Sequence, residues 1–159
     1  LYRYRTGDII SVEGFVHQCP LIRFVGREGS ISDLVGEKLT EVFVALAIKN
    51  AMRRSGLSPT YACLIPKQDS EPRYQLALDI QCDLDDEKRS ELSSIMEDEL
   101  WQNPYYEHAV RVGQLRALEV SPSDPAGVSH WDAFQNRSLQ RGRRRGEIKP
   151  VALDTTGLH

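Results

Sequence analysis

The sequence contains few of the residues that hold small secreted or metal-binding proteins together. Its three cysteines, Cys19, Cys63 and Cys82, are far apart and include no Cys-x-x-Cys pair. An odd number at this spacing argues against a disulfide framework or a structural zinc site, and it fits a reducing cytoplasm. Cys63 and Cys82 stand in apolar runs, where we expect each thiol to pack as a small hydrophobic group.

The sequence also lacks a long apolar segment and an excess of positive charge. No run approaches the roughly 18 apolar residues that a membrane helix needs, and no signal peptide is visible. The formal net charge of -3 argues against a general binder of nucleic acid or anionic membranes. The 159 residues, 40% of them hydrophobic, suffice for about one domain with a buried core. Because the chain opens on Leu1 inside a motif, we expect a fragment of a longer cytoplasmic protein.

Apolar alternation and turn residues predict a β-hairpin at the start of the chain, with strands over residues 8–16 and 21–27. Glu28-Gly29-Ser30 breaks the pattern and predicts a hinge. The domains would then be a hinge-proximal hairpin over residues 1–28, which carries a nucleotide motif, and a small C-terminal domain over residues 29–159. We expect an α+β fold, in which a small mixed β-sheet is packed with helices and preceded by the hairpin. The later strands are expected over 31–35, 60–65, 74–82 and 115–120, and helices are expected to begin near 40, 83, 103 and 129.

The spacing of apolar residues predicts which faces enter the core. In the strand over 74–82 they alternate with other residues, so one face that begins at Tyr74 should be buried. The helix that Thr40 caps is apolar nearly all round over residues 42–48, which predicts deep packing. The aromatic residues expected beneath the helices are Tyr105, Tyr106, Trp131 and Phe134.

Three charged residues near the start of the chain suit different parts of a nucleotide. Asp8, at the mouth of a strand, can accept hydrogen bonds from two neighbouring ribose hydroxyls. Arg27, after a second strand, can donate to the same sugar or to a phosphate. Lys38, in a flexible glycine turn, is a mobile cation able to meet an α-phosphate or a carboxylate. Each also has a structural alternative as an ordinary strand-end or turn residue.

The order of these motifs resembles the hinge and small C-terminal domain of adenylate-forming enzymes. The stretches Tyr4-Arg5-Thr6-Gly7-Asp8-Ile9-Ile10, Gly14-Phe15 and Cys19-Pro20-Leu21-Ile22-Arg23-Phe24-Val25 are similar to those of the auxin-responsive acyl-acid amido synthetase family. The glycine after Val25 and the turn Gly36-Glu37-Lys38 are closer to its bacterial-type members than to its plant members. The resemblance covers most of the chain, and it is specific up to about Thr40.

The resemblance implies a ligase that uses ATP, with AMP as a product and with Mg²⁺. A carboxylic acid would form an acyl-adenylate, and an amine, expected to be that of an amino acid, would attack it; a thiol acceptor stays open. Asp8 and Arg27 would bind the nucleotide, and Lys38 would approach the phosphate when the small domain closes. The domain partner would be an N-terminal adenylation domain of the same protein.

The basic tract over residues 140–150 carries the last candidate. Adenylate-forming enzymes have a near-terminal lysine in a Gly-x-x-Lys-like setting, and Lys149 after Gly146 is the one match in this chain. The resemblance therefore implies that Lys149 is catalytic, whereas blocks of like charge are usually solvated tails. The alternative from another class is a stand-alone, non-catalytic α+β binding or regulatory module.

Overall fold

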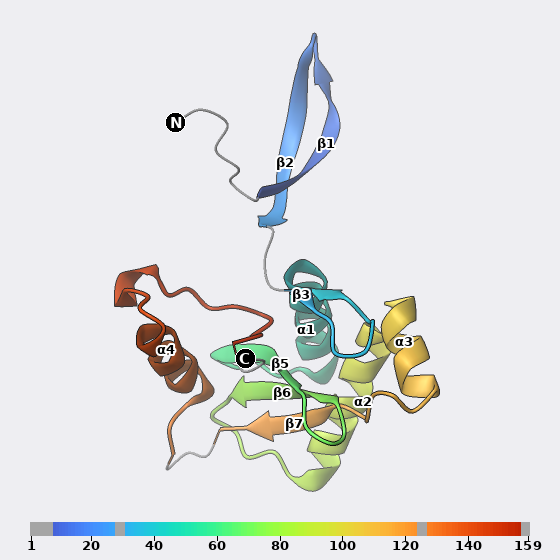
Figure 1. The fold of residues 1–159 in the computed structure, drawn as a ribbon, viewed down its shortest axis with the longest axis vertical. Helices are drawn as coiled ribbons and strands as arrows, with labels where there is room; N and C mark the ends of the chain where they lie inside the picture. Colours follow the sequence, from blue (N-terminus) through green and yellow to red (C-terminus); the bar gives the residue numbers. More distant parts are fainter. Residues whose placement is uncertain (1–7, 28–30, 124–126, 157–159) are drawn as a thin grey trace.

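The computed structural model describes residues 8–27, 31–123 and 127–156. The expected hinge at 28–30 lies outside these ranges, and at residues 8–9 and 24–27 only the backbone is described. The predicted α+β class is confirmed, because the described ranges contain four α-helices and small sheets, preceded by an antiparallel hairpin (Figure 1). No helix within the described ranges is both long and apolar enough to cross a membrane.

The hairpin consists of β1 (Asp8–Val16) and β2 (Cys19–Arg27). Its tight turn is possible because His17 adopts a left-handed conformation, with a φ of 54°. The hairpin extends away from the other elements in Figure 1. Among its side chains, Phe15 and Ile22 are more than half exposed. A two-stranded hairpin with exposed apolar groups is marginally stable alone, so this one needs a further surface to pack against.

The remaining elements surround a three-stranded mixed sheet. β5 (Tyr61–Lys67) pairs antiparallel with β6 (Arg73–Asp79), which pairs parallel with β7 (Glu119–Pro122). Near the end of the chain, Leu153 forms a parallel bridge to Leu64 on the free edge of β5. The other elements are β3 (Ile31–Ser32), β4 (Leu39–Thr40), α1 (Glu41–Ser55), α2 (Asp86–Leu100), α3 (Pro104–Arg111), α4 (His130–Gln140) and a 3₁₀ turn (Arg145–Glu147).

Both faces of the sheet are covered. On one face, the side chains of β6 that begin at Tyr74 join a core with α1, α2 and α3, as the alternation predicted. On the other face, Tyr61 of β5 stacks on Phe134 of α4, with ring centroids 6.4 Å apart. Asp79 holds the N-terminus of α4, where its carboxylate accepts hydrogen bonds from the backbone N–H groups of His130 and Trp131.

The helix starts were predicted well because each has a side-chain cap. Thr40, Asp85, Asn103 and Ser129 accept hydrogen bonds from the first turns of α1, α2, α3 and α4. The C-terminus of α1 lies at Gly56, whose φ of 69° suits glycine.

Several sequence expectations were wrong in detail. The strand expected over 31–35 ends at Ser32, and the one expected over 115–120 is β7, shifted toward the C-terminus. The first half of α1 is not buried all round, because one side alone faces the core and Leu46 is 56% exposed. Tyr105 is 67% exposed, while the next residue, Tyr106, takes the inward position on α3.

Candidate functional site

Asp8 and Arg27 lie opposite each other at the open end of the hairpin. The antiparallel register of β1 and β2 pairs them directly, followed by Ile9 with Gly26. Two residues 19 positions apart in sequence, each expected to contact a nucleotide, are therefore neighbours on adjacent strands. The predicted Tyr4-Arg5-Thr6-Gly7 stretch lies outside the described residues.

The buried side chain of Glu37 holds the turn that carries Lys38. The Glu37 side chain is fully buried, and its carboxylate accepts hydrogen bonds from the backbone N–H groups of Leu34 and Val35 at 2.8 and 2.9 Å. The Tyr74 hydroxyl donates to the same carboxylate. Burial and the adjacent Glu37 carboxylate both raise the pKa of Tyr74, so the phenol stays protonated and remains a donor.

The anchored turn presents Lys38 to solvent in a constrained backbone. Lys38 is exposed and has a φ of 46°, a left-handed conformation that costs a non-glycine residue roughly 1 kcal/mol. The Asn103 side chain reinforces the turn, because its amide donates to the Glu37 carbonyl at 3.1 Å. A flexible turn was expected here; its backbone is instead held by buried contacts, and the freedom that remains is in the lysine side chain.

A shallow groove adjoins Lys38. Phe43 of α1 and Pro104 and Tyr105 of α3 give it apolar walls, while Gln102 and Thr40 add polar groups. The two backbone N–H groups at the start of α3 are already bonded to Asn103, so they are not free for an anion. Lys38 is the charged group of this groove.

Lys149 lies in the exposed basic tract, between two buried anchor points. Ile148 is buried just before it, and Leu153 is buried after it at the edge of β5. Between these two points the segment approaches α1, where the backbone N–H of Ala152 lies 3.4 Å from a carboxylate oxygen of Glu41. Because Glu41 follows the Lys38 turn by three residues, the segments that carry the two lysines meet at the N-terminus of α1.

An ion pair fixes the end of this C-terminal segment. The Asp154 carboxylate is buried and accepts a hydrogen bond from the Arg137 guanidinium of α4 at 2.6 Å. The other oxygen of Asp154 accepts hydrogen bonds from the backbone N–H and the hydroxyl of Thr156. Backbone hydrogen bonds between Leu64 and the segment on either side of Leu153 complete the attachment.

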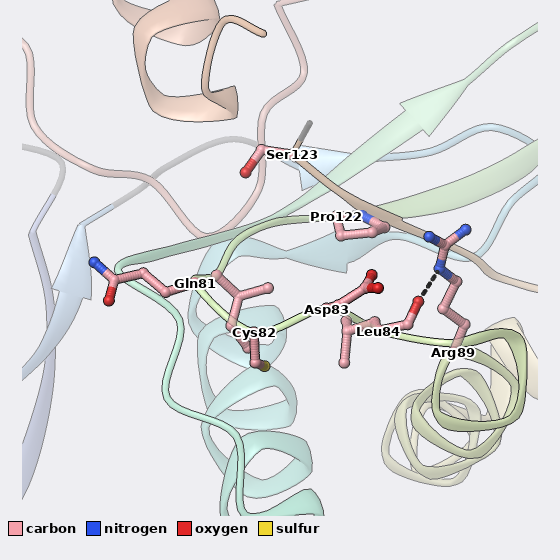
Figure 2. Close-up of a pocket in the computed structure, with 8 residues that line it drawn as sticks. Gln81, Cys82, Asp83, Leu84, Arg89, Pro122 and Ser123 are labelled. Atoms are coloured by element: carbon pink, nitrogen blue, oxygen red, sulfur yellow. Dashed lines mark hydrogen bonds between the residues drawn. The ribbon is translucent and has the colours of Figure 1, made fainter. Parts of the chain in front are cut away.

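A second cavity, not predicted from the sequence, opens at the carboxyl ends of β6 and β7 (Figure 2). It includes Cys82, which is exposed and not packed in a strand, because β6 ends at Asp79. The charged residues Asp83 and Arg89 also line it. A sequence signal existed, since polar residues directly after parallel strands often mark a binding crevice.

The described residues contain no group of three or more His, Cys, Asp or Glu side chains that could hold a metal ion. All three cysteines are unpaired thiols, and Cys63 is buried as expected. Burial raises the pKa of the Cys63 thiol to about 12, so it remains protonated and unreactive.

Comparison with known proteins identifies two matching family models. Residues 1–27 match the GH3 family central domain, and residues 43–155 match the GH3 family C-terminal domain. Among structures, the chain is similar to the GH3.15 acyl acid amido synthetase, with a TM-score of 0.77 and 22% identity over 98% of this chain. That likeness establishes a shared fold.

The related sequences are longer proteins. The 4-substituted benzoates-glutamate ligase GH3.12 of Arabidopsis thaliana is 27% identical over 94% of this chain, which spans 28% of that protein. The indole-3-acetic acid-amido synthetase GH3.6 of the same plant is 40% identical over 33% of this chain and 8% of its own length. The GH3 domain-containing protein of Mus musculus is 26% identical over 74% of this chain and 26% of its own length.

Proposed function

The chain belongs to the GH3 family, and we propose that it is the C-terminal part of an ATP-dependent ligase that joins a carboxylic acid to the amine of an amino acid through an acyl-adenylate. In this proposal residues 1–28 form the hinge-proximal hairpin and residues 29–159 the small C-terminal domain. An N-terminal adenylation domain of the same protein would supply the rest of the active site. The unpaired thiols of this chain support a cytoplasmic location for the protein.

The observation that carries the proposal is the pairing of Asp8 with Arg27. The strand pairing places the backbones of these two residues side by side, without the entropy cost of ordering two loops. A carboxylate can accept from ribose hydroxyls, and an arginine can donate to the sugar or to a phosphate. Because β2 leads directly into the segment before Lys38, movement about this segment would carry the lysine toward or away from the nucleotide.

The two steps of the reaction need cations at different atoms. ATP supplies an electrophilic α-phosphorus and a pyrophosphate leaving group for attack by the carboxylate oxygen. The amine nitrogen then attacks the acyl carbon, AMP leaves, and the nitrogen loses a proton. Lys38 and Lys149 would stabilise the negative charge that develops on phosphate and carboxylate oxygens during these displacements.

Magnesium that accompanies ATP is usually bound by phosphate oxygens and by one or two carboxylates. The described residues form no metal-binding group, so Mg²⁺ that accompanies ATP would be held by the nucleotide and by groups outside them.

The name of the GH3.12 relative, a benzoates-glutamate ligase, favours an amine acceptor over a thiol such as coenzyme A. Family membership likewise favours the ligase over the stand-alone module, since matches to both a central and a C-terminal domain model are characteristic of part of a multidomain enzyme.

Replacement of Asp8 tests the proposal in the full-length protein. Loss of hydrogen bonds to a charged group costs about 1.5–3 kcal/mol each, so Asp8→Ala should raise the KM for ATP by roughly ten- to over a hundred-fold. ATP–pyrophosphate exchange measures this change. Glu13→Ala is the matched control, because Glu13 lies on the same strand and pairs with Arg23 at the surface. If Asp8→Ala leaves the KM for ATP unchanged, Asp8 does not bind the nucleotide.

A further inference from the structure

The cavity at the carboxyl ends of β6 and β7 has the size and lining of a small-molecule site. Its volume is about 610 Å³, within the usual range for ligand pockets. Ile80 and Pro122 provide apolar surface, Leu84 is buried beneath it, and the polar residues extend from the strand ends to the first turn of α2. Figure 2 shows the Asp83 carboxylate and the Arg89 guanidinium on the same side of this cavity, near Pro122.

These two opposite charges face one cavity without pairing to each other. No ion pair joins Asp83 to Arg89 within the part of the chain that the structure describes. The Nε–H of Arg89 donates to the Leu84 carbonyl at 2.9 Å, which fixes the plane of the guanidinium. Its Nη1 lies 4.0 Å from a carboxylate oxygen of Asp86, and that side chain is fully exposed. The Nη groups therefore retain donors for a ligand.

The surrounding charges select against ligands of a single sign. A simple anion would face Asp83 and the acidic first turn of α2, where the Asp85 carboxylate already accepts from the Lys88 N–H. A simple cation would be repelled by Arg89. A ligand that carries both an ammonium and a carboxylate satisfies both residues.

We propose that this cavity binds a free α-amino acid as its zwitterion, with the carboxylate on Arg89 and the ammonium on Asp83. The side chain of the amino acid would lie against the apolar residues Ile80 and Pro122. Gln81 and Ser123, at the rim, offer additional hydrogen bonds.

This site is separate from the one proposed for the ligase. The Lys38 turn is fixed to Tyr74 at the start of β6, whereas the cavity begins at Ile80, just past its end. Six residues of extended chain separate the two positions by about 20 Å. An amino acid in the cavity is therefore a second ligand, distinct from an acceptor at Lys38, and its binding does not depend on the proposed ligase reaction.

Cys82 provides a reporter inside the cavity. It is an exposed thiol in the lining, while Cys19 is an exposed thiol on the hairpin, outside the cavity, and Cys63 is buried. In the full-length protein, without ATP or a carboxylic acid, saturating L-alanine, L-leucine or L-glutamate should slow alkylation of Cys82 by iodoacetamide at least tenfold. The rate at Cys19 should not change. The N-acetyl and amide derivatives, which each lack one charge, should protect weakly or not at all.

Two variants assign the protection to the proposed partners. Arg89→Gln and Asp83→Asn should each weaken the protecting affinity about tenfold or more. Lys88→Gln, which changes the neighbouring exposed cation on α2, should behave as the unmodified protein. Thermal melting confirms that each variant is folded, and the Cys19 rate serves as the internal standard.

The proposal is overturned if none of the three amino acids protects Cys82. It is also overturned if protection persists with equal affinity in folded Arg89→Gln and Asp83→Asn. Because the assay contains no ATP, these results leave the ligase proposal untouched, and loss of ligase activity would leave this site standing.

Discussion

At the scale of single residues, charge in this protein is positioned by buried neighbours. Lys38 is exposed, but the turn beneath it is held by the buried Glu37 carboxylate and by Asn103. Lys149 is likewise exposed between the buried residues Ile148 and Leu153. A cation on a fixed backbone loses less entropy when it meets a phosphate than one on a free loop, which is an advantage for catalysis.

The two lysines should affect different half-reactions. In the full-length protein, Lys149→Ala should lower pyrophosphate exchange by about 10², the scale for loss of one charge-stabilising donor, while amide formation from pre-made acyl-adenylate survives. Lys38→Ala should slow amide formation at least as much as adenylation. Single-turnover measurements with labelled acid separate the steps, and Lys49→Ala on the exposed side of α1 is the control. Equal, modest losses in both steps for both variants would refute step-specific roles.

Glu97 should make stability depend on pH. Burial raises its pKa above the usual 4.5, although the Leu118 N–H, Tyr106 hydroxyl and Trp101 indole all donate to the carboxylate. The folded state therefore binds this proton more tightly than the unfolded state. Its stabilising contribution is complete below about pH 4.5 and is lost as the pH rises through the raised pKa.

Urea unfolding at pH 4.5 and pH 7 tests this link. Glu97→Gln should lose less stability than the unmodified protein between the two pH values, because the titrating group is gone. Glu91→Gln, an exposed change on the same helix, should retain the original dependence. Parallel stability curves for Glu97→Gln and the unmodified protein would show that Glu97 is not the titrating group.

At the scale of elements, Asn103 joins two structures that are far apart in sequence. Its side-chain oxygen caps α3 by accepting from the N–H groups of Tyr105 and Tyr106, and its amide donates to the Glu37 carbonyl. The start of α3 and the Lys38 turn are therefore held by one side chain.

Substitutions at Asn103 should separate these two contacts. Asn103→Ala removes both and should lower the free energy of unfolding by about 1–3 kcal/mol. Asn103→Ser keeps a capping oxygen but is too short to donate to Glu37, so it should recover about 1 kcal/mol of that loss. Chemical denaturation measures both. If Ala and Ser variants are equally stable, the capping bond contributes nothing measurable.

Local sequence signals predicted the elements whose stabilising groups are close in sequence. The cap residues, the glycine at position 56 and the alternation of β6 each act within a few residues, so the start of each helix and one buried face were correct. The exposure of Leu46 and Tyr105 depends on which side of a helix the sheet occupies, a tertiary property. β7 was misplaced because its register is set by parallel pairing with distant β6.

In the candidate site, too, the features set by nearby residues were predicted and those set by distant contacts were missed. Asp8, Arg27 and Lys38 were singled out by motif, and the hairpin pairing of Asp8 with Arg27 follows from local strand signals. Their roles are still predictions. The Glu37 anchor was missed because its partners Tyr74 and Asn103 lie 37 and 66 residues away. Arg89 and Asp83 were missed because the cavity exists only after β6 and β7 pair.

At the scale of the whole molecule, the end of the described chain completes the sheet. The Leu64 N–H donates to the Ala152 carbonyl at 2.8 Å, and the Asp154 N–H donates back to Leu64 at 2.9 Å. The ion pair between Asp154 and Arg137 secures this attachment to α4.

Loss of the Asp154 carboxylate should release this edge selectively. Asp154→Ala leaves Arg137 unpaired, and the cost should be about 1–3 kcal/mol because the guanidinium is partly exposed. Amide hydrogen exchange should accelerate at Leu64, while Ala77 within the β5–β6 ladder should keep its protection. Asp98→Ala, which removes a surface partner of Arg54, is the control. Unchanged exchange at Leu64 would contradict this role.

The attachment of residues 152–154 to β5 also has a consequence for biosynthesis. β5 and β6 are joined by a short connection and can pair while the polypeptide is still being made. Residues 152–154, which include the partner of Arg137, are translated some 90 residues after Leu64, so the outer edge of β5 is open while the intervening chain is made. During that interval the open edge is exposed to pairing with other chains, and it can be covered only once residues 152–154 have left the ribosome.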